Sequence, residues 1–199
     1  MSDQVCKTAV EGLKKRGYEA EFVKTGAEAA AIVMREAEGA QSVGWGGSET
    51  VKALGLREKL TAAGKEVRDH QLVMDLFLLS ANALTADGRI VNIDGNGNRV
   101  AASVHGPKRV IYLIGRNKIV AGGVDEAIAR IHRCACPPNC KRLGKRTPCA
   151  LAGACGDGHD GLAGGCDSPD RICKVTAVFD RRPTGVSTKV IVIDEDLGY

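Results

Sequence analysis

The run RVIYLIG at residues 109–115 limits the possible folds of this 199-residue chain more than any other feature. Apolar residues fill it without the polar alternation that a half-exposed strand would show. A strand of this kind needs cover on both faces, as in the centre of a parallel sheet between two layers of helices. The run therefore predicts an α/β fold.

Helix and strand signals alternate on either side of this run. Residues 4–15 have the apolar spacing of a helix and end before Gly17, a suitable residue after a helix. Thr25–Glu28 has the spacing of a capping box, which predicts a second helix. Asp87-Gly88 between two strand-like segments predicts a hairpin. Together these signals predict one domain over residues 1–199, with a mainly parallel sheet flanked by helices and an antiparallel edge.

Charge and hydropathy exclude several classes of protein. The net charge is +4, and the densest basic run, within residues 141–146, has no interleaved aromatic residues. This favours a solvated loop over a nucleic-acid interface. No apolar run approaches the ~20 residues of a membrane span, and the polar amphipathic N-terminus is unlike a secretory signal. We expect a cytoplasmic, reducing location, in which disulfides are a weak explanation for eight cysteines.

The first glycine-rich turn, GWGGSET, lies between a predicted strand and a predicted helix. Gly46 and Gly47 would let the backbone approach a ligand closely, and Ser48 is placed to cap the helix. A phosphate, a carboxylate or an acyl-carrier group would suit such a turn. It matches neither a Walker A sequence nor G-x-G-x-x-G, and a tight turn without a ligand is the alternative.

The second glycine-rich turn, NIDGNGN, follows another predicted strand. Turns of this composition at the carboxyl end of a sheet strand are where α/β folds bind ligands, although asparagine and glycine also suit a purely structural turn. The predicted ligand-binding residues here are Asn92, Asp94, Gly95, Asn96, Gly97 and Asn98. Asp94 is also the best-placed group for acid–base chemistry, and Asp69 and His70 are placed to face the same crevice. The sequence specifies no catalytic residue.

An irregular segment rich in cysteine and glycine occupies residues 134–173, near the C-terminus. Its last four cysteines, spaced C-x5-C-x10-C-x6-C, are the predicted metal ligands: Cys149, Cys155, Cys166 and Cys173. The spacing lacks the close pairs of zinc ribbons and is looser than ferredoxin runs, so it leaves both a [4Fe–4S] cluster and zinc open. A closed site of this type can also be purely structural. Whether Cys134, Cys136, Cys140 or His159 joins the site stays open.

Several of these segments resemble the lactate-utilisation (LUD) domain family. The resemblance runs from about Val43 to Cys173 through VGWGGSET, ADGRIVNIDGNGNRVAASVHGPKRVIYLIGRNKI, PPNCKRLGKRTPC and SPDRIC. It differs where GDGHDGLAGG enlarges the gap between Cys155 and Cys166. The family is similar in architecture to ribose-5-phosphate isomerase, glucosamine-6-phosphate deaminase and the CoA transferases.

The resemblance implies a small anionic ligand between the two turns and a role in the oxidation of lactate or another 2-hydroxy acid beside iron–sulfur redox subunits. Two alternatives accompany this expectation. One is a phosphosugar-isomerase-like or CoA-transferase-like enzyme with a structural metal, and the other is a non-catalytic subunit that docks a redox partner. A homodimer is the expected assembly.

Overall fold

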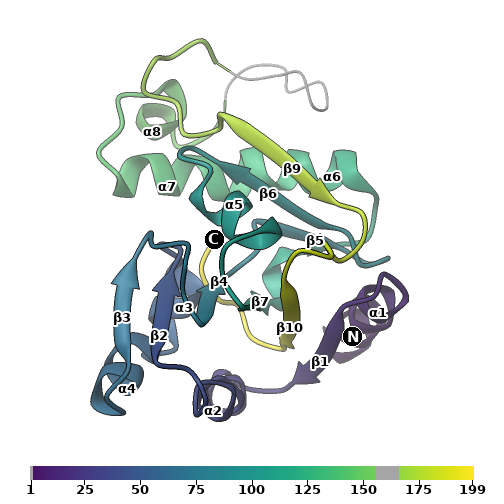
Figure 1. Cartoon of the computed structure of the whole chain (residues 1–199). Coiled ribbons are helices and arrows are strands. Elements are labelled where there is room, and N and C mark those ends of the chain that lie inside the picture. The colour runs from purple at the N-terminus through teal and green to yellow at the C-terminus, as the bar shows by residue number, and fades with distance from the viewer. Residues whose placement is uncertain (1, 156–165) are drawn as a thin grey trace.

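The computed structural model describes residues 2–155 and 166–199. Helices and strands alternate along the first half of the chain, as the sequence predicts (Figure 1). The helices are α1 (Ser2–Lys15), α2 (Gly26–Glu36), α3 (Glu49–Ala53), α4 (Leu56–Ala62), α5 (Asn98–Val104), α6 (Val124–Arg130), α7 (Cys136–Arg142) and α8 (Pro148–Ala152). The strands are β1 (Glu19–Val23), β2 (Ser42–Trp45), β3 (Glu66–Asp69), β4 (Leu76–Leu79), β5 (Ala83–Thr85), β6 (Ile90–Asp94), β7 (Arg109–Gly115), β8 (Ile119–Val120), β9 (Val175–Phe179) and β10 (Ser187–Ile193).

The larger sheet has six strands in the order β1-β10-β7-β4-β2-β3, and all of its pairs are parallel. The run RVIYLIG forms β7, between β10 and β4. Val110, Tyr112 and Ile114 of this strand join a core that α1 and α5 complete on one face. Ile111 and Leu113 join the core formed with α2, α3 and α4 on the other face. The α/β fold with a helix-flanked parallel sheet is therefore confirmed.

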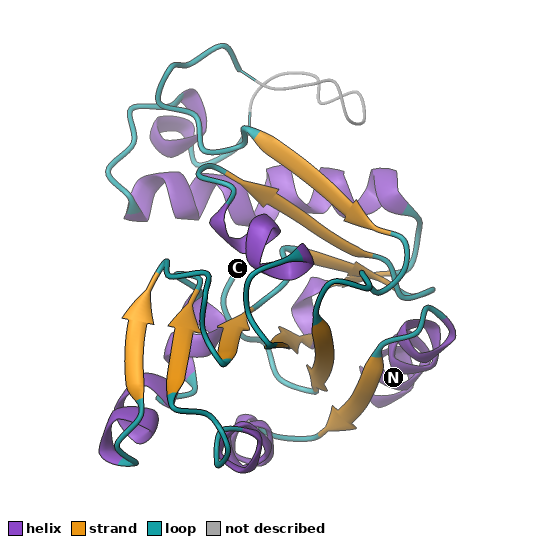
Figure 2. Ribbon diagram, in the orientation of Figure 1, coloured by secondary structure: helices purple, strands orange, loops and turns teal. Residues whose placement is uncertain are grey.

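A smaller sheet, in the order β8-β5-β6-β9, lies beside the larger one. The predicted hairpin at Asp87-Gly88 joins β5 and β6, which pair antiparallel. The helical stretch from α6 to α7 packs along this sheet through a third core that includes Val91 and Ile128 (Figure 2). The helical stretch that covers the smaller sheet also contains the first cysteines of the cysteine-rich segment.

A π-helical turn, Ile131–Ala135, joins α6 to α7 in one continuous helical stretch. Its wider bond runs from the Cys136 amide to the Ile131 carbonyl. Pro137 and Pro138 follow, and because proline has no N–H, the helix loses two successive hydrogen-bond donors here. The cysteine-rich segment therefore begins in a helix, and residues 153–155 and 166–174 are irregular. Such π-turns occur often at functional sites.

Helix α1 packs very closely against the β5–β6 hairpin. A Cβ on Gly12 would lie 2.5 Å from the Asp87 carbonyl carbon, and Gly88 has a φ of +91°. Arg16 donates from Nε to the Asp87 carbonyl at 2.6 Å and pairs with its carboxylate at 2.7 Å. Glycine at both positions permits this backbone contact, which joins the N-terminal helix to the smaller sheet.

Within the described residues, no helix has both the length and the apolar character that crossing a membrane requires.

Candidate functional site

The two glycine-rich turns lie close together in the fold. The first follows β2, where Ser48 caps α3 by accepting a hydrogen bond from the Val51 amide at 3.3 Å. A Cβ on Gly46 would lie only 2.9 Å from Cγ of Arg99, which follows the second turn. Asn98 Nδ2 is 3.1 Å from His70 Nδ1, a second contact between the two regions. These contacts explain why the first turn requires glycine.

Several polar groups of the second turn are used within the fold. Asn92 is fully buried, and its side-chain oxygen accepts from the Asn82 amide at 2.9 Å. Asp94 accepts from the amides of Arg99 (3.0 Å) and Val100 (3.3 Å), so it caps α5. Asp94 also pairs with the Arg99 guanidinium at 3.7 Å. Its carboxylate is thus engaged in structural contacts.

The remaining predicted residues of this turn differ in their surroundings. Gly97 has a φ of +79° at the start of α5, and Asn96 is exposed. A Cβ on Gly95 would lie 3.1 Å from the carbonyl oxygen of Ile172, the neighbour of Cys173. The second turn therefore lies between the first turn and the cysteine-rich segment.

An inner cavity of about 40 Å³ lies at the carboxyl ends of β2, β4 and β7. This is where open α/β sheets bind ligands. Its walls come from the first turn, the residues after β4 and β7, the start of α5 and the α7 region. The polar lining residues are Ser48, Glu49, Thr50, Ser80, Asn82, Arg99, Lys118, Asn139 and Tyr199.

Lys118, at the end of a 3-10 turn after β7 (Arg116–Lys118), is the central charged group of this inner cavity. Only 4% of it is exposed. Its Nζ donates to Thr50 Oγ1 at 2.7 Å and to Ser80 Oγ at 2.9 Å. Burial, followed by the charges of Arg130 and Arg99, lowers the pKa of Lys118 to about 7. A buried amine of this kind can bind an anion, accept a proton or attack a carbonyl carbon.

An outer cavity of about 370 Å³ lies on the other side of Gly47 and Ser48. Asp69 and His70, which the sequence placed near the crevice, both line it. His70 has a φ of +58°, the one positive φ outside glycine in the described chain. Side chains in this backbone region are strained, and such residues gather at functional sites.

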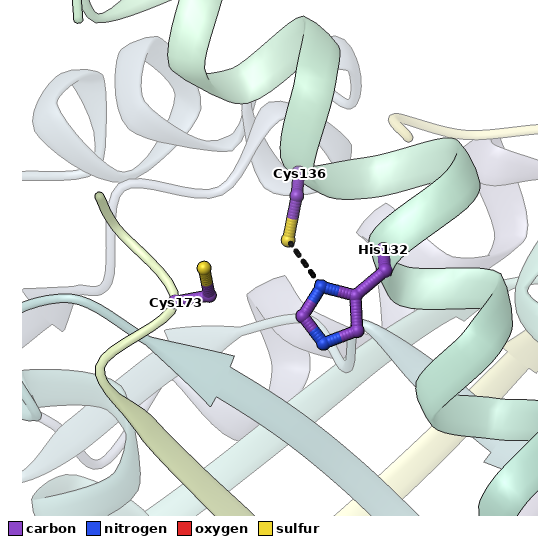
Figure 3. Close-up of side chains that lie close together, drawn as sticks. All are labelled: His132, Cys136 and Cys173. Atoms are coloured by element: carbon purple, nitrogen blue, oxygen red, sulfur yellow. Dashed lines mark hydrogen bonds between the residues drawn. The ribbon is translucent and has the colours of Figure 1, made fainter. Parts of the chain in front are cut away.

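Three side chains with metal-binding atoms meet beside the smaller sheet. The ligand atoms of His132, Cys136 and Cys173 all lie within 4.8 Å of one another (Figure 3). His132 and Cys136 are four residues apart on the π-turn, and Nδ1 lies 3.9 Å from Sγ. Cys173 comes from the irregular segment that leads to β9. A hydrogen bond from Cys136 to Cys173 lowers the pKa of Cys173, and that bond with burial raises the pKa of Cys136.

Four other cysteines of the segment interact with this trio or with one another. The Cys140 thiol hydrogen-bonds with Thr147 and Cys149, and burial raises its pKa. Burial raises the pKa of Cys155 to about 11, with smaller contributions from Cys149, Cys173, Cys166 and Cys140. Electrostatic interactions thus link six thiols, hereafter the thiol cluster: Cys136, Cys140, Cys149, Cys155, Cys166 and Cys173.

Of the four predicted ligands, Cys173 lies in the trio and the other three lie elsewhere in the thiol cluster. The ligand set Cys149, Cys155, Cys166 and Cys173 stays a prediction. Cys134 is exposed. His159 lies outside the described residues.

The donors of this region fit a soft metal. Thiolate and imidazole are the ligands that zinc and iron–sulfur centres use. Around zinc, ligand bonds of about 2.0–2.3 Å would bring sulfur and nitrogen atoms within about 4 Å of one another, so the trio needs only a small contraction. His132, Cys136 and Cys173 supply three ligands, and the thiol cluster contains further sulfur atoms for a fourth.

Sequence reasoning missed Lys118, Arg130 and His132. In RNKIV, Lys118 has the composition of a surface turn, and its burial follows from the packing of α3 and of residues after β10 over β7. His132 and Cys136 had a usable signal, because their i, i+4 spacing places both on one face of a helix.

These features define an α/β domain with a polar cavity at the carboxyl ends of its parallel strands and a thiol-rich region attached to a second, smaller sheet. The family model of the LUD domain matches residues 6–193, so the chain belongs to the LUD domain family. Among solved structures, it is similar to a DUF162-family protein from Deinococcus radiodurans, with 15% identity and a TM-score of 0.58. That match covers 97% of this chain and 98% of the other. A comparison with curated proteins gives no significant match.

Proposed function

We propose that this LUD-domain protein takes part in the utilisation of lactate or a related 2-hydroxy acid. In this proposal, a small anionic ligand binds beside the two glycine-rich turns, and the thiol cluster with His132 holds zinc or a [4Fe–4S] cluster. Membership of the LUD domain family supports a role related to lactate utilisation. The proposed location is the cytoplasm.

The observation that carries the proposal is the convergence of His132, Cys136 and Cys173 within 4.8 Å, beside four further thiol-cluster residues. These side chains come from segments about 40 residues apart in sequence, and neither Cys136 nor Cys173 is in a disulfide. Buried thiols without a ligand favour their protonated form, whereas a metal ion stabilises thiolates. A reducing compartment keeps such thiols available.

A bound [4Fe–4S] cluster would supply one-electron transfer, which suits the oxidation of a 2-hydroxy acid beside iron–sulfur partner subunits. Zinc would instead fix the irregular segment against the smaller sheet. In both cases the chain's own residues have the same tasks. His132 and the cysteines bind the metal, and the contact of Gly95 with Ile172 keeps the second turn beside it.

Metal analysis and absorption spectroscopy of the anaerobically purified full chain test the proposal. We expect either iron with visible cluster absorption or one zinc ion per chain. Cys136→Ser and Cys173→Ser should each lose most of the metal. Cys134→Ser is the matched control, because this cysteine is exposed and should leave the metal content unchanged. A wild-type chain that binds neither metal after reconstitution would contradict the proposal.

A phosphosugar-isomerase-like or CoA-transferase-like enzyme is the second candidate function. The outer cavity of about 370 Å³ favours it, because that cavity has room for a larger ligand and is lined by Lys52, Arg57 and His70. Isomerisation of phosphosugars by the isolated chain, retained in His132→Ala, would support this alternative. Lactate oxidation by the isolated chain would instead exclude a subunit that only docks a redox partner.

A further inference from the structure

We propose that the inner cavity binds the carboxylate of a 2-hydroxy or 2-oxo acid, and that Lys118 is its principal ligand. This inference rests on the proposed function and names the binding residue. It follows from three observations: the partners of Lys118, the charges around it and the size of the cavity.

The partners of Lys118 orient the amine without neutralising it. Thr50 and Ser80 accept hydrogen bonds from Nζ, and their own hydroxyls donate to the carbonyls of Leu197 (3.0 Å) and Ala81 (3.3 Å). An ammonium group has three N–H donors, so two fixed partners leave one donor for a ligand. Ser48, which lines the same cavity, accepts from the Val51 amide and keeps its own hydroxyl proton to donate.

The charges around Lys118 favour an anion. Arg99 on α5 and Arg130 on α6 both act on it, and Arg130 donates only to the carbonyls of Asn117 and Asn82 among the bonds described for it. Of these two arginines, Arg99 also has a carboxylate partner, Asp94.

The acidic side chain on the lining is Glu49, on α3, which lies 3.6 Å from Arg142. Basic side chains therefore outnumber acidic ones on the lining, with Lys118 and Arg99 against Glu49. A buried cation without a carboxylate partner is costly, and a bound anion removes that cost.

The size of the inner cavity selects the chemical class. At about 40 Å³, it accommodates roughly three water-sized groups. A carboxylate with its α-carbon matches this volume. A phosphosugar or a CoA group would need the outer cavity instead.

Binding of the acid should depend on pH in a defined direction. The pKa of Lys118 in the free protein is about 7, and an adjacent carboxylate raises it. Above pH 7 the free amine is largely neutral, so binding must add a proton. The affinity should therefore fall about tenfold for each pH unit above 7, until the pH reaches the raised pKa.

Isothermal calorimetry on the full metal-loaded chain tests this inference with L-lactate, pyruvate and inorganic phosphate as probes. We expect lactate or pyruvate to bind at pH 7, with about one proton taken up at pH 8 when two buffers of different ionisation enthalpy are compared. Lys118→Met should weaken binding at least tenfold and abolish the proton uptake. Lys24→Met, an exposed lysine outside the cavity, should behave as wild type.

Ser80→Ala provides a second variant, which keeps the amine but removes one partner. It should weaken binding roughly threefold to tenfold, the usual contribution of one hydrogen bond. Carboxylate binding that is unchanged in Lys118→Met, binding without proton uptake, preference for phosphate or no binding at all would each overturn the inference.

Metal content separates this inference from the proposed function. Lys118→Met should retain the metal of the wild type. A metal-loaded chain that fails these binding tests therefore removes only the Lys118 inference, whereas a chain without metal removes the proposed centre.

Discussion

Replacing Lys118 by methionine should stabilise the fold at neutral pH, although it removes the central group of the inner cavity. The structure buries this amine and lowers its pKa from 10.5 to about 7. Each pKa unit corresponds to about 1.4 kcal/mol, so burial of the protonated amine costs roughly 5 kcal/mol at pH 6 and about 4 kcal/mol at pH 7. Methionine fills a similar volume without this cost.

The lost hydrogen bonds offset part of the gain. Thr50 and Ser80 keep their own donations to Leu197 and Ala81, so each loses only an accepted bond, worth about 1 kcal/mol. We therefore expect Lys118→Met to raise the free energy of unfolding by about 2–4 kcal/mol at pH 7.

The pH dependence gives the stricter test. Between pH 7 and about 10, the unfolded chain holds a proton on Lys118 that the folded chain has lost, so wild-type stability should rise with pH. The advantage of Lys118→Met should shrink by about 1.4 kcal/mol per pH unit over this range and be constant below about pH 6.

Urea denaturation of both proteins at pH 6, 8 and 9, with Lys24→Met as the control, measures this difference. A constant gap between wild type and Lys118→Met across these pH values would refute the reasoning, because it would mean that the amine titrates normally in the folded protein.

Three further predictions concern other parts of the chain. Gly12→Ala should destabilise the fold by about 3 kcal/mol or more in urea denaturation, because its Cβ would meet hairpin backbone at 2.5 Å, whereas Gly39→Ala, with open space around it, should change stability little. Asp94→Ala should cost about 2–4 kcal/mol in the same assay, because it removes the acceptor of two α5 amides and the carboxylate partner of half-buried Arg99, and Asp94→Asn should cost less because its side-chain oxygen still caps α5. Alkylation of the native protein, followed by mass spectrometry, should label exposed Cys134 and spare Cys6, which is fully buried with a pKa raised to about 11 by burial; equal labelling of both would contradict this.

Local sequence signals predicted much of the fold. The apolar run at 109–115 specified a strand covered on both faces, and Asp87-Gly88 specified the hairpin. Ser48 and Thr25 cap their helices as their positions in the sequence suggest. Each of these signals comes from residues that are close together in the sequence, so a single sequence is enough to detect it.

The candidate site was less predictable, because its geometry depends on distant contacts. Asp94 has the composition of a free ligand group, yet the backbone amides of α5 and the Arg99 side chain engage it. Lys118 is buried only because Thr50 and Ser80, 68 and 38 residues away in sequence, close around it. Burial of a polar side chain by partners so far away leaves no periodic pattern in the sequence.

The π-turn after α6 joins residues beside the inner cavity and residues of the metal-binding trio in one continuous helical stretch. Arg130, just before the turn, holds the carbonyls of Asn82 and Asn117, beside the inner cavity, while His132 and Cys136 point to the thiol cluster. A metal that draws His132 and Cys136 closer together would shift the helical backbone that also carries Arg130. Loss of metal should therefore change the environment of the Lys118 amine through the charge of Arg130, which lies two residues before His132, without any change in the residues that line the inner cavity.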